Sequence, residues 1–260
     1  MPLGVRYYTD PACPASWAVE PALRRLILEF GTDLSITYVM GGLARQFDDP
    51  ASMIVPWLDA SERSGMPLDP RLWSEAPLSS SYPACMAVKA AAEQGPEAAG
   101  RYLRALREGL MCFRRKLDTP EALVAEARGA GLDVARFRSS LESHAIVEAF
   151  GADLEETRSV SGFVFPSLRL EGPAGVEWLL GKEGYEDWHA AAAAAGGVPS
   201  GATLSDPLAA VGRFGRLATV EVATLCDLPL TRAAADLWTL AAELRVRPVR
   251  VLTGVLWELA

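Results

Sequence analysis

The stretch Asp10-Pro11-Ala12-Cys13-Pro14-Ala15-Ser16-Trp17 decides the fold prediction for this chain. A short β-prone segment, 5–9, precedes it, and residues 16–30 follow with the apolar spacing of a helix. An apolar and partly β-branched segment, 34–40, comes next. The chain is therefore predicted to begin strand, helix, strand, with Cys13 at the point where the first strand passes into the first helix.

Cys13 is the reactive residue of this stretch. Unpaired N–H groups and the helix dipole at a helix N-terminus favour an anion. We therefore expect a lowered pKa for this thiol and a larger thiolate fraction at neutral pH. A thiolate is the form that attacks a disulfide or an electrophile. A cysteine without such a setting is more often an inert buried residue, so the prediction depends on the position of Cys13.

Ser16 and Trp17, which follow Cys13 in the motif, each have two interpretations. Ser16 caps the helix by accepting a hydrogen bond from a first-turn N–H, or it donates one to the Cys13 thiolate, and the two roles are compatible. Trp17, together with Trp57, borders a groove for an apolar peptide or ligand, or simply packs in the core. Pro21 is expected to bend the first turns of the helix.

The middle of the chain predicts a sheet that carries a helical insertion. Residues 41–78 are rich in Gly and Pro and indicate a long irregular segment with short helical turns. Residues 83–150 indicate four or five helices, and in one of them an apolar stripe lies opposite a polar face that includes Arg101, Arg104, Arg107 and Glu108. The β pattern then returns as a hairpin, 163–170 and 175–180, followed by a helix at 185–195. This order is typical of a mixed α/β fold.

The last part of the chain predicts a separate small module. A Gly/Pro/Ser-rich stretch, 196–207, is expected to be a linker. Helices at 219–225 and 231–244 and strands at 246–252 and 255–259 then give the outline of a winged-helix-like module. Six arginines face six carboxylates between residues 201 and 260, so we expect a packing or protein-contact role and no binding of DNA.

The motif from Asp10 to Pro21, followed by Leu23-Arg24-Arg25-Leu26 and Met40-Gly41-Gly42-Leu43, resembles the DsbA-like thioredoxin-fold family, in particular its cytoplasmic SpxH- and FrnE-type branch. The resemblance covers about residues 3–195. It implies a thioredoxin-like domain at 1–198, with a helical insertion at about 80–158, ahead of the module at 207–260. It also implies a cis-proline facing the motif cysteine, which we place at Pro166.

On this resemblance Cys13 and Ser16 are the catalytic positions, and Ser16 stands where the family has its second cysteine. Substrate-binding roles fall to Pro14, Trp17, Phe165 and Pro166, with the backbone N–H of Phe165 as the contact for an extended substrate segment. A hydroxyl group cannot resolve a mixed disulfide, so dithiol cycling at this motif is excluded. Monothiol chemistry, resolution by a distant cysteine, and binding without catalysis remain open. We expect Cys85, Cys112 and Cys226 to be small core residues.

Three functional hypotheses follow. The first is a monothiol DsbA-like oxidoreductase that acts through Cys13 on protein thiols or on a low-molecular-weight thiol, with no other cofactor and no metal. The second is a non-catalytic adaptor of the SpxH type that holds a protein client. The third is chemistry of the kappa-class glutathione transferase or isomerase kind, in which a serine acts together with bound glutathione.

Net charge, the length of apolar runs and the spacing of cysteines argue against several other classes of protein. The net charge of −8 disfavours a nucleic-acid partner. The longest low-polarity run, 190–198, is too short to span a bilayer. Apolar sequence begins at Val5, and the four cysteines show no paired spacing, so we expect a cytoplasmic protein with reduced thiols.

Overall fold

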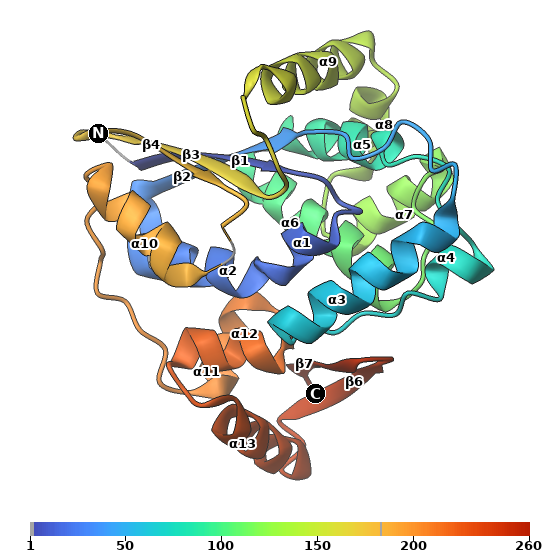
Figure 1. Ribbon diagram of the computed structural model, residues 1–260. Helices are drawn as coiled ribbons and strands as arrows, with labels where there is room; N and C mark the ends of the chain where they lie inside the picture. The colour runs from blue at the N-terminus through green and yellow to red at the C-terminus, as the bar shows by residue number, and fades with distance from the viewer. Residues whose placement is uncertain (1–2, 183) are drawn as a thin grey trace.

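The computed structural model describes residues 3–182 and 184–260, and its N-terminal part is built on a four-stranded mixed sheet (Figure 1). The strand order is β2-β1-β3-β4, in which β1 runs parallel to β2 and antiparallel to β3, while β3 and β4 form a hairpin. The strands are β1 Leu3–Thr9, β2 Leu34–Met40, β3 Ser167–Gly172 and β4 Gly175–Leu180. The predicted strands and hairpin are confirmed, although β3 begins four residues later than expected, after a cis peptide bond.

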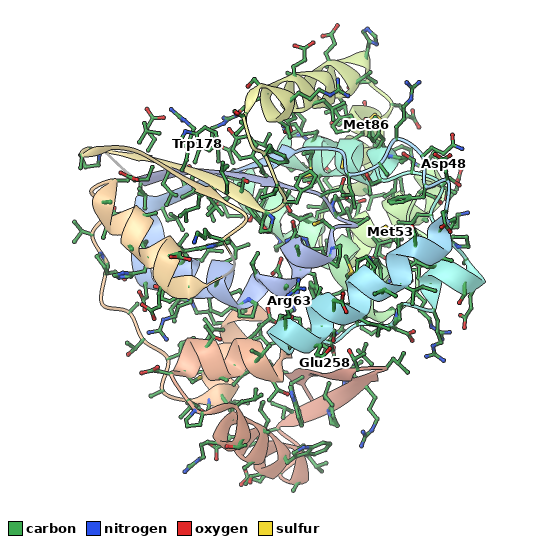
Figure 2. All side chains as sticks on the ribbon, in the orientation of Figure 1. Asp48, Met53, Arg63, Met86, Trp178 and Glu258 are labelled. Carbon is green, nitrogen blue, oxygen red and sulfur yellow. The ribbon has the colours of Figure 1, made fainter. Side chains whose placement is uncertain are left out.

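The two faces of this sheet have different neighbours. Val5 and Tyr7 of β1 point toward α2 (Glu20–Phe30) and α10 (Tyr185–Ala194) and form a core with Trp188. Tyr8 points to the opposite face, where its ring stacks on Trp178 and its hydroxyl donates a hydrogen bond of 2.6 Å to Glu156 of α9. Figure 2 shows Trp178 on the side of the sheet away from α10. The sheet is thus covered by α2 and α10 on one face and partly by α9 on the other (Figure 1).

The predicted first helix is interrupted at Val19. Helix α1 spans Pro14–Ala18 and α2 spans Glu20–Phe30. Pro21 has no N–H to bond to the Trp17 carbonyl, and a proline ring inside a helix clashes with the preceding turn. The expected bend is therefore a full break between two helices.

The segment 41–78 contains more helix than its prolines and glycines suggest. It holds a 3₁₀ turn, η2, at Pro50–Met53, the eleven-residue helix α3 at Ile54–Ser64, and the short helix α4 at Leu72–Glu75. Pro56 is tolerated because it lies in the first turn of α3. Gly65 ends α3 in the left-handed conformation with φ = 72°.

The helical insertion is confirmed and runs from residue 82 to residue 159. It packs against the edge strand β2 and contributes most of the residues of the main apolar core among the described residues. Its elements are α5 Tyr82–Ala92, α6 Pro96–Arg107, the π-helical turn η3 Glu108–Cys112, α7 Pro120–Gly129, α8 Val134–Leu141 and α9 His144–Ser159.

The C-terminal part forms a second, three-stranded antiparallel sheet in the order β5-β7-β6. Its elements are α11 Pro207–Phe214, β5 Leu217–Ala218, α12 Thr219–Cys226, α13 Leu230–Ala242, β6 Val246–Val251 and β7 Gly254–Leu259. The two predicted helices and two predicted strands are present within two residues of their expected bounds. Helix α11 and strand β5 were not expected. The winged-helix-like classification and the division into domains stay predictions.

Buried contacts join the C-terminal part to the rest of the chain. Ala218 and Leu256 belong to the same apolar core as the insertion. The turn between β6 and β7 reaches α3, where the Thr253 and Ser61 hydroxyls are hydrogen-bonded at 2.8 Å, and Thr253 also accepts from the Leu68 N–H. Figure 1 shows the C-terminal elements below α2 and α3.

A buried ion network lies between α2, α6 and α12. Arg104 of α6 bonds to Glu20 of α2 at 3.0 Å and to Glu221 of α12 at 2.7 Å, and Arg24 bonds to Glu221 at 2.8 Å. Arg107 is fully buried and pairs with Glu20. Burial raises the pKa of the Glu20 carboxyl, but the guanidinium groups of Arg104, Arg107 and Arg24 outweigh it and lower this pKa to about 2.

This network corrects the prediction for α6. The residues opposite its apolar stripe were expected to form a polar face, yet Arg107 and Glu108 are buried. Carboxylates from other elements neutralise the arginines, including Glu20 and Glu221, and Arg216 pairs with Glu108 at 2.8 Å. The C-terminal part thus covers the face of α6 that the periodicity of α6 marks as polar.

Replacing Glu221 with Gln should destabilise the fold strongly. The Glu221 carboxylate is fully buried between Arg24 and Arg104, and loss of its charge leaves these two guanidinium groups with fewer carboxylates to compensate them. Removing one partner of a buried pair costs about 3–5 kcal/mol in the free energy of unfolding. Urea unfolding measures this change. The matched control, Asp236→Asn, breaks the solvent-facing pair with Arg232 and should cost no more than about 1 kcal/mol. Equal losses in the two variants would contradict the role given to Glu221.

Candidate functional site

Cys13 lies at the junction between β1 and the first helix, as the sequence predicted, and it occupies the N-cap position of α1. Its N–H donates to the Asp10 carbonyl at 3.2 Å, and its carbonyl accepts from the Trp17 N–H at 3.1 Å. Pro14, the first residue of the helix, and Ala15 are partly exposed beside it. The Cys13 side chain itself is only 4% exposed, and its sulfur is not in a disulfide.

The environment of Cys13 corrects the expected direction of its pKa. Burial is the largest effect and raises the pKa of the thiol, and the nearby Asp10 carboxylate also raises it. Ser16 and the Arg107 guanidinium act in the opposite direction, but the net shift is upward. Helix α1 has five residues, so its dipole is small. In this conformation the sulfur is therefore held as a thiol.

Ser16 does not cap the helix. It is the third residue of α1, and the N-cap position belongs to Cys13. The Ser16 hydroxyl is buried and lies close enough to Cys13 to lower its pKa, but it forms no hydrogen bond of normal geometry with any group in the described ranges. Of its two predicted roles, only the one toward the sulfur remains.

Trp17 packs in the core. Its ring is fully buried, its Nε1–H donates to the Pro67 carbonyl at 2.9 Å, and the Arg104 guanidinium lies 4.5 Å from the ring centroid. Trp57 is also fully buried and packs edge-on against Trp73. Neither ring forms the wall of an open groove here, so the packing interpretation holds and a substrate contact for Trp17 does not fit this conformation.

The Phe165–Pro166 peptide bond is cis, as the resemblance to the DsbA-like family implied. Pro166 immediately precedes β3, whose Ser167 pairs with Tyr8 of β1, so this loop lies at the end of β1 from which Cys13 follows. The Pro166 carbonyl accepts from the Gly181 N–H at 3.0 Å, and the Ser167 hydroxyl donates to the Val164 carbonyl at 2.6 Å. A substrate contact through the Phe165 N–H stays a prediction.

Gly41 has a packing role that the sequence did not reveal. Its N–H donates to the Thr9 carbonyl at 2.9 Å, and a Cβ atom at this position would lie 2.5 Å from the Phe165 ring. The ring therefore lies directly on the backbone that follows β2. Only glycine leaves that space, and the Gly41-Gly42 pair in the sequence was the available signal.

Asp10 and Arg107 are site residues that the sequence interpretation did not single out. Asp10 was part of the quoted motif, and its carboxylate is fully buried. Arg107 comes from the insertion and donates to the Thr9 hydroxyl and to Glu20. No sequence signal placed Arg107 here, because it lies about one hundred residues from β1.

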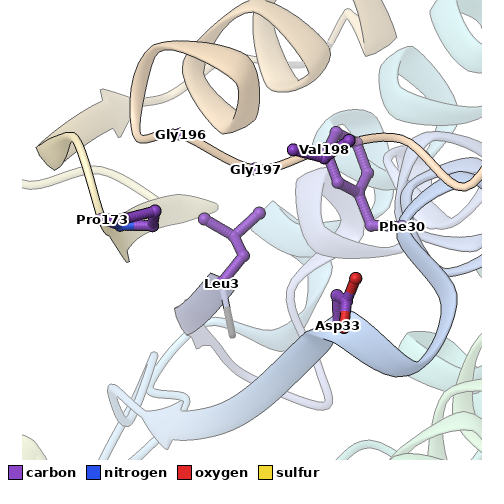
Figure 3. A pocket seen from close by; sticks show the side chains of 7 residues that line it. All are labelled: Leu3, Phe30, Asp33, Pro173, Gly196, Gly197 and Val198. Carbon is purple, nitrogen blue, oxygen red and sulfur yellow. The ribbon is translucent and has the colours of Figure 1, made fainter. Parts of the chain in front are cut away.

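No other centre competes with this site among residues 3–182 and 184–260. The structure groups no three His, Cys, Asp or Glu side chains in a way that could hold a metal ion, and no helix of these residues is long and apolar enough to cross a membrane. A hollow at the opposite end of β1 contains none of the predicted site residues (Figure 3). Its lining residues are Leu3, Phe30, Asp33, Pro173, Gly196, Gly197 and Val198.

Comparison with known proteins identifies the family. A family model described as thioredoxin matches residues 7–170. The ClpXP adapter protein SpxH of Shouchella clausii is 31% identical over 99% of this chain and 88% of its own length. The chain belongs to the thioredoxin family and, within it, to the SpxH proteins. The ClpXP adapter protein SpxH of Halalkalibacterium halodurans is 28% identical, again over 99% of this chain and 89% of the relative.

Solved structures agree on the fold. The cytosolic disulfide reductase DsbM from Pseudomonas aeruginosa matches with a TM-score of 0.60 at 19% identity, over 72% of this chain and 95% of that chain. A DsbA-type oxidoreductase from Streptomyces coelicolor matches with a TM-score of 0.60 at 19% identity, over 78% and 94%. The α/β fold is thus thioredoxin-like and of the DsbA type, as the resemblance implied.

Alkylation of Cys13 by iodoacetamide should show a midpoint above pH 8.5, the ordinary value for a cysteine thiol, because burial and Asp10 raise its pKa. At pH 7.5 the folded chain should react at least roughly tenfold more slowly at Cys13 than the same chain unfolded in urea, as measured by mass spectrometry of the Cys13 peptide. A folded-state midpoint below that of the unfolded chain would show that the helix N-terminus outweighs burial.

Proposed function

We propose that this chain is an adapter that delivers client proteins to a ClpXP-type protease. One observation carries the proposal: the similarity to ClpXP adapter proteins spans 99% of this chain and 88–89% of those relatives. The shared region therefore includes the C-terminal part as well as the thioredoxin-like part. The similarity to solved oxidoreductases covers 72–78% of the chain.

The chemistry of the site supports a binding role over dithiol catalysis. Ser16 stands where a second motif thiol would resolve a mixed disulfide, and its hydroxyl cannot do so. Cys13 is buried and its pKa is raised, so it is a poor nucleophile at neutral pH. Neither feature hinders the binding of a protein.

An adapter needs one contact surface for its client and another for the protease. On α3, which packs against α1, Val55 and Leu58 are 63% and 40% exposed. On the C-terminal part, Leu230 and Trp238 of α13 are 53% and 45% exposed. Exposed apolar side chains of this kind are typical of protein contacts. The two sets lie on different helices, α3 and α13, which gives each partner a separate candidate contact.

The C-terminal arginines favour a protein partner over nucleic acid. Arg216, Arg232, Arg245 and Arg247 are each paired with a carboxylate of the same part of the chain. Arg213 and Arg250 lie over the rings of Phe214 and Trp238. A phosphate backbone would have to displace these partners. A cytoplasmic location, where such a protease and its clients meet, belongs to the same proposal.

A monothiol oxidoreductase is the second candidate, favoured by the placement of Cys13 at a helix N-cap and by the cis-proline at the same end of the sheet. In that reaction the Cys13 thiolate attacks a disulfide, one S–S bond forms as another breaks, and a thiolate leaves. A second molecule, either a protein thiol or a low-molecular-weight thiol, must then release Cys13, because Ser16 cannot.

Protein half-lives in living cells test the two candidates. A client should be stabilised both in a strain lacking this chain and in a strain lacking ClpXP. With purified components, the chain should accelerate degradation of that client by ClpXP, and the Cys13→Ala variant should do so equally well. Absence of any protein stabilised in both strains would refute the adapter role. Loss of the acceleration in Cys13→Ala would favour the thiol reaction.

A further inference from the structure

The Asp10 carboxylate accepts four hydrogen bonds inside the protein. Oδ1 accepts from the Ala12 N–H at 2.8 Å. Oδ2 accepts from the Leu43 N–H at 2.6 Å, from the Ser81 hydroxyl at 2.8 Å and from the Cys85 thiol at 3.2 Å. All four donors are neutral groups, and Asp10 is fully buried. A buried carboxylate is retained only where such donors replace the water it has lost.

These four bonds join three segments of the chain. Ala12 belongs to the turn that ends in Cys13, Leu43 to the loop after β2, and Ser81 and Cys85 to the start of α5 in the insertion. The loop and α5 are further held together by mutual hydrogen bonds between Ala44 and Ser81. The carbonyl of Asp10 also accepts from the Cys13 N–H. The shape of the Cys13 turn therefore depends on Asp10 through both its main chain and its side chain.

The charged groups around Cys13 are Asp10 on its own turn and Arg107 from α6. Their effects on the thiol have opposite signs, but Arg107 is already paired with Glu20, which offsets much of its charge. Burial raises the pKa of the Asp10 carboxyl and its four hydrogen bonds lower it, but none of the four donors supplies a counter-charge. On the far side of Asp10, Cys85 faces Asp153, whose charge is paired with Lys89 at 2.8 Å.

We infer that Asp10 is a positioning residue of the Cys13 site, whose side chain fixes the Cys13 turn to the helical insertion and places a negative charge near the Cys13 sulfur. The inference deepens the adapter proposal and rests on it, because burial and this charge both favour the thiol form of Cys13, and a thiol does not attack a client's disulfide to form a mixed disulfide. In a catalytic relative of this fold, the charges around the motif cysteine would have to favour its thiolate.

The pH dependence of alkylation tests this inference. Asp10→Asn removes the charge, so the midpoint for Cys13 should fall by about one pH unit, and the rate of reaction with iodoacetamide at pH 8 should rise roughly tenfold. Ser81→Ala removes one hydrogen bond to the same carboxylate but keeps its charge, so its midpoint should match that of the unaltered chain. Equal shifts in the two variants, or no shift in Asp10→Asn, would overturn the inference.

A measurement on the unaltered chain tests the inference even if the Asp10 variant misfolds. The ¹³C resonance of the Asp10 carboxyl carbon should show an inflection at the pH where Cys13 ionises, because two interacting groups sense each other's titration. The inflection should be missing in Cys13→Ser. Its presence in both proteins, or its absence from the unaltered chain, would also overturn the inference. Neither experiment involves a client or protease, so failure of the adapter role would show only in the degradation assay.

Discussion

A buried guanidinium group has to be compensated, and the architecture of this protein is arranged around that requirement. Arg104 and Arg107 extend from α6 into the space between the first helices, the insertion and the C-terminal part. Glu20 approaches them from one side and Glu221 from the other. If either carboxylate were absent, less negative charge would remain to offset the desolvation of the arginines. The relative placement of three separate parts of the chain therefore depends on charge pairing as well as on apolar packing.

The same arrangement connects the C-terminal part to Cys13. Arg104 contacts Glu221 of α12 and lies over the ring of Trp17, four residues beyond Cys13. Arg107, one turn further along α6, donates to the Thr9 hydroxyl beside Asp10. Rigid, fully paired networks of this kind hold a site in one geometry. A buried thiol in a rigid setting suits a site that binds proteins. It is less suited to a catalytic site, which must expose a thiolate in each cycle.

Local sequence signals predicted those features that depend on a few neighbouring residues. The strand, helix and strand around Cys13 and the helices of the insertion came from short motifs or periodicity, whereas the cis bond at Pro166 was implied by the resemblance to the DsbA-like family. Helix α3 was missed because Pro56 and its neighbours read as loop, although a proline in a first turn is harmless. The burial of Arg107 could not be read locally, since its partners Glu20 and Thr9 lie 87 and 98 positions away in the sequence. The raised pKa of Cys13 could not be read locally either, because burial is its largest cause and burial depends on the packing of the whole fold.

The charge pairs across α6 and α12 also restrict how this protein can change during evolution. A recombination event that joined these first two hundred residues to the C-terminal part of a relative with an apolar side chain at position 221 would remove the carboxylate that pairs with both Arg24 and Arg104. Exchange of the whole C-terminal segment is then unfavourable unless the new segment also has an acidic residue at position 221. The two parts are expected to be inherited as one unit, and substitutions at residues 24, 104 and 221 should be correlated among descendants.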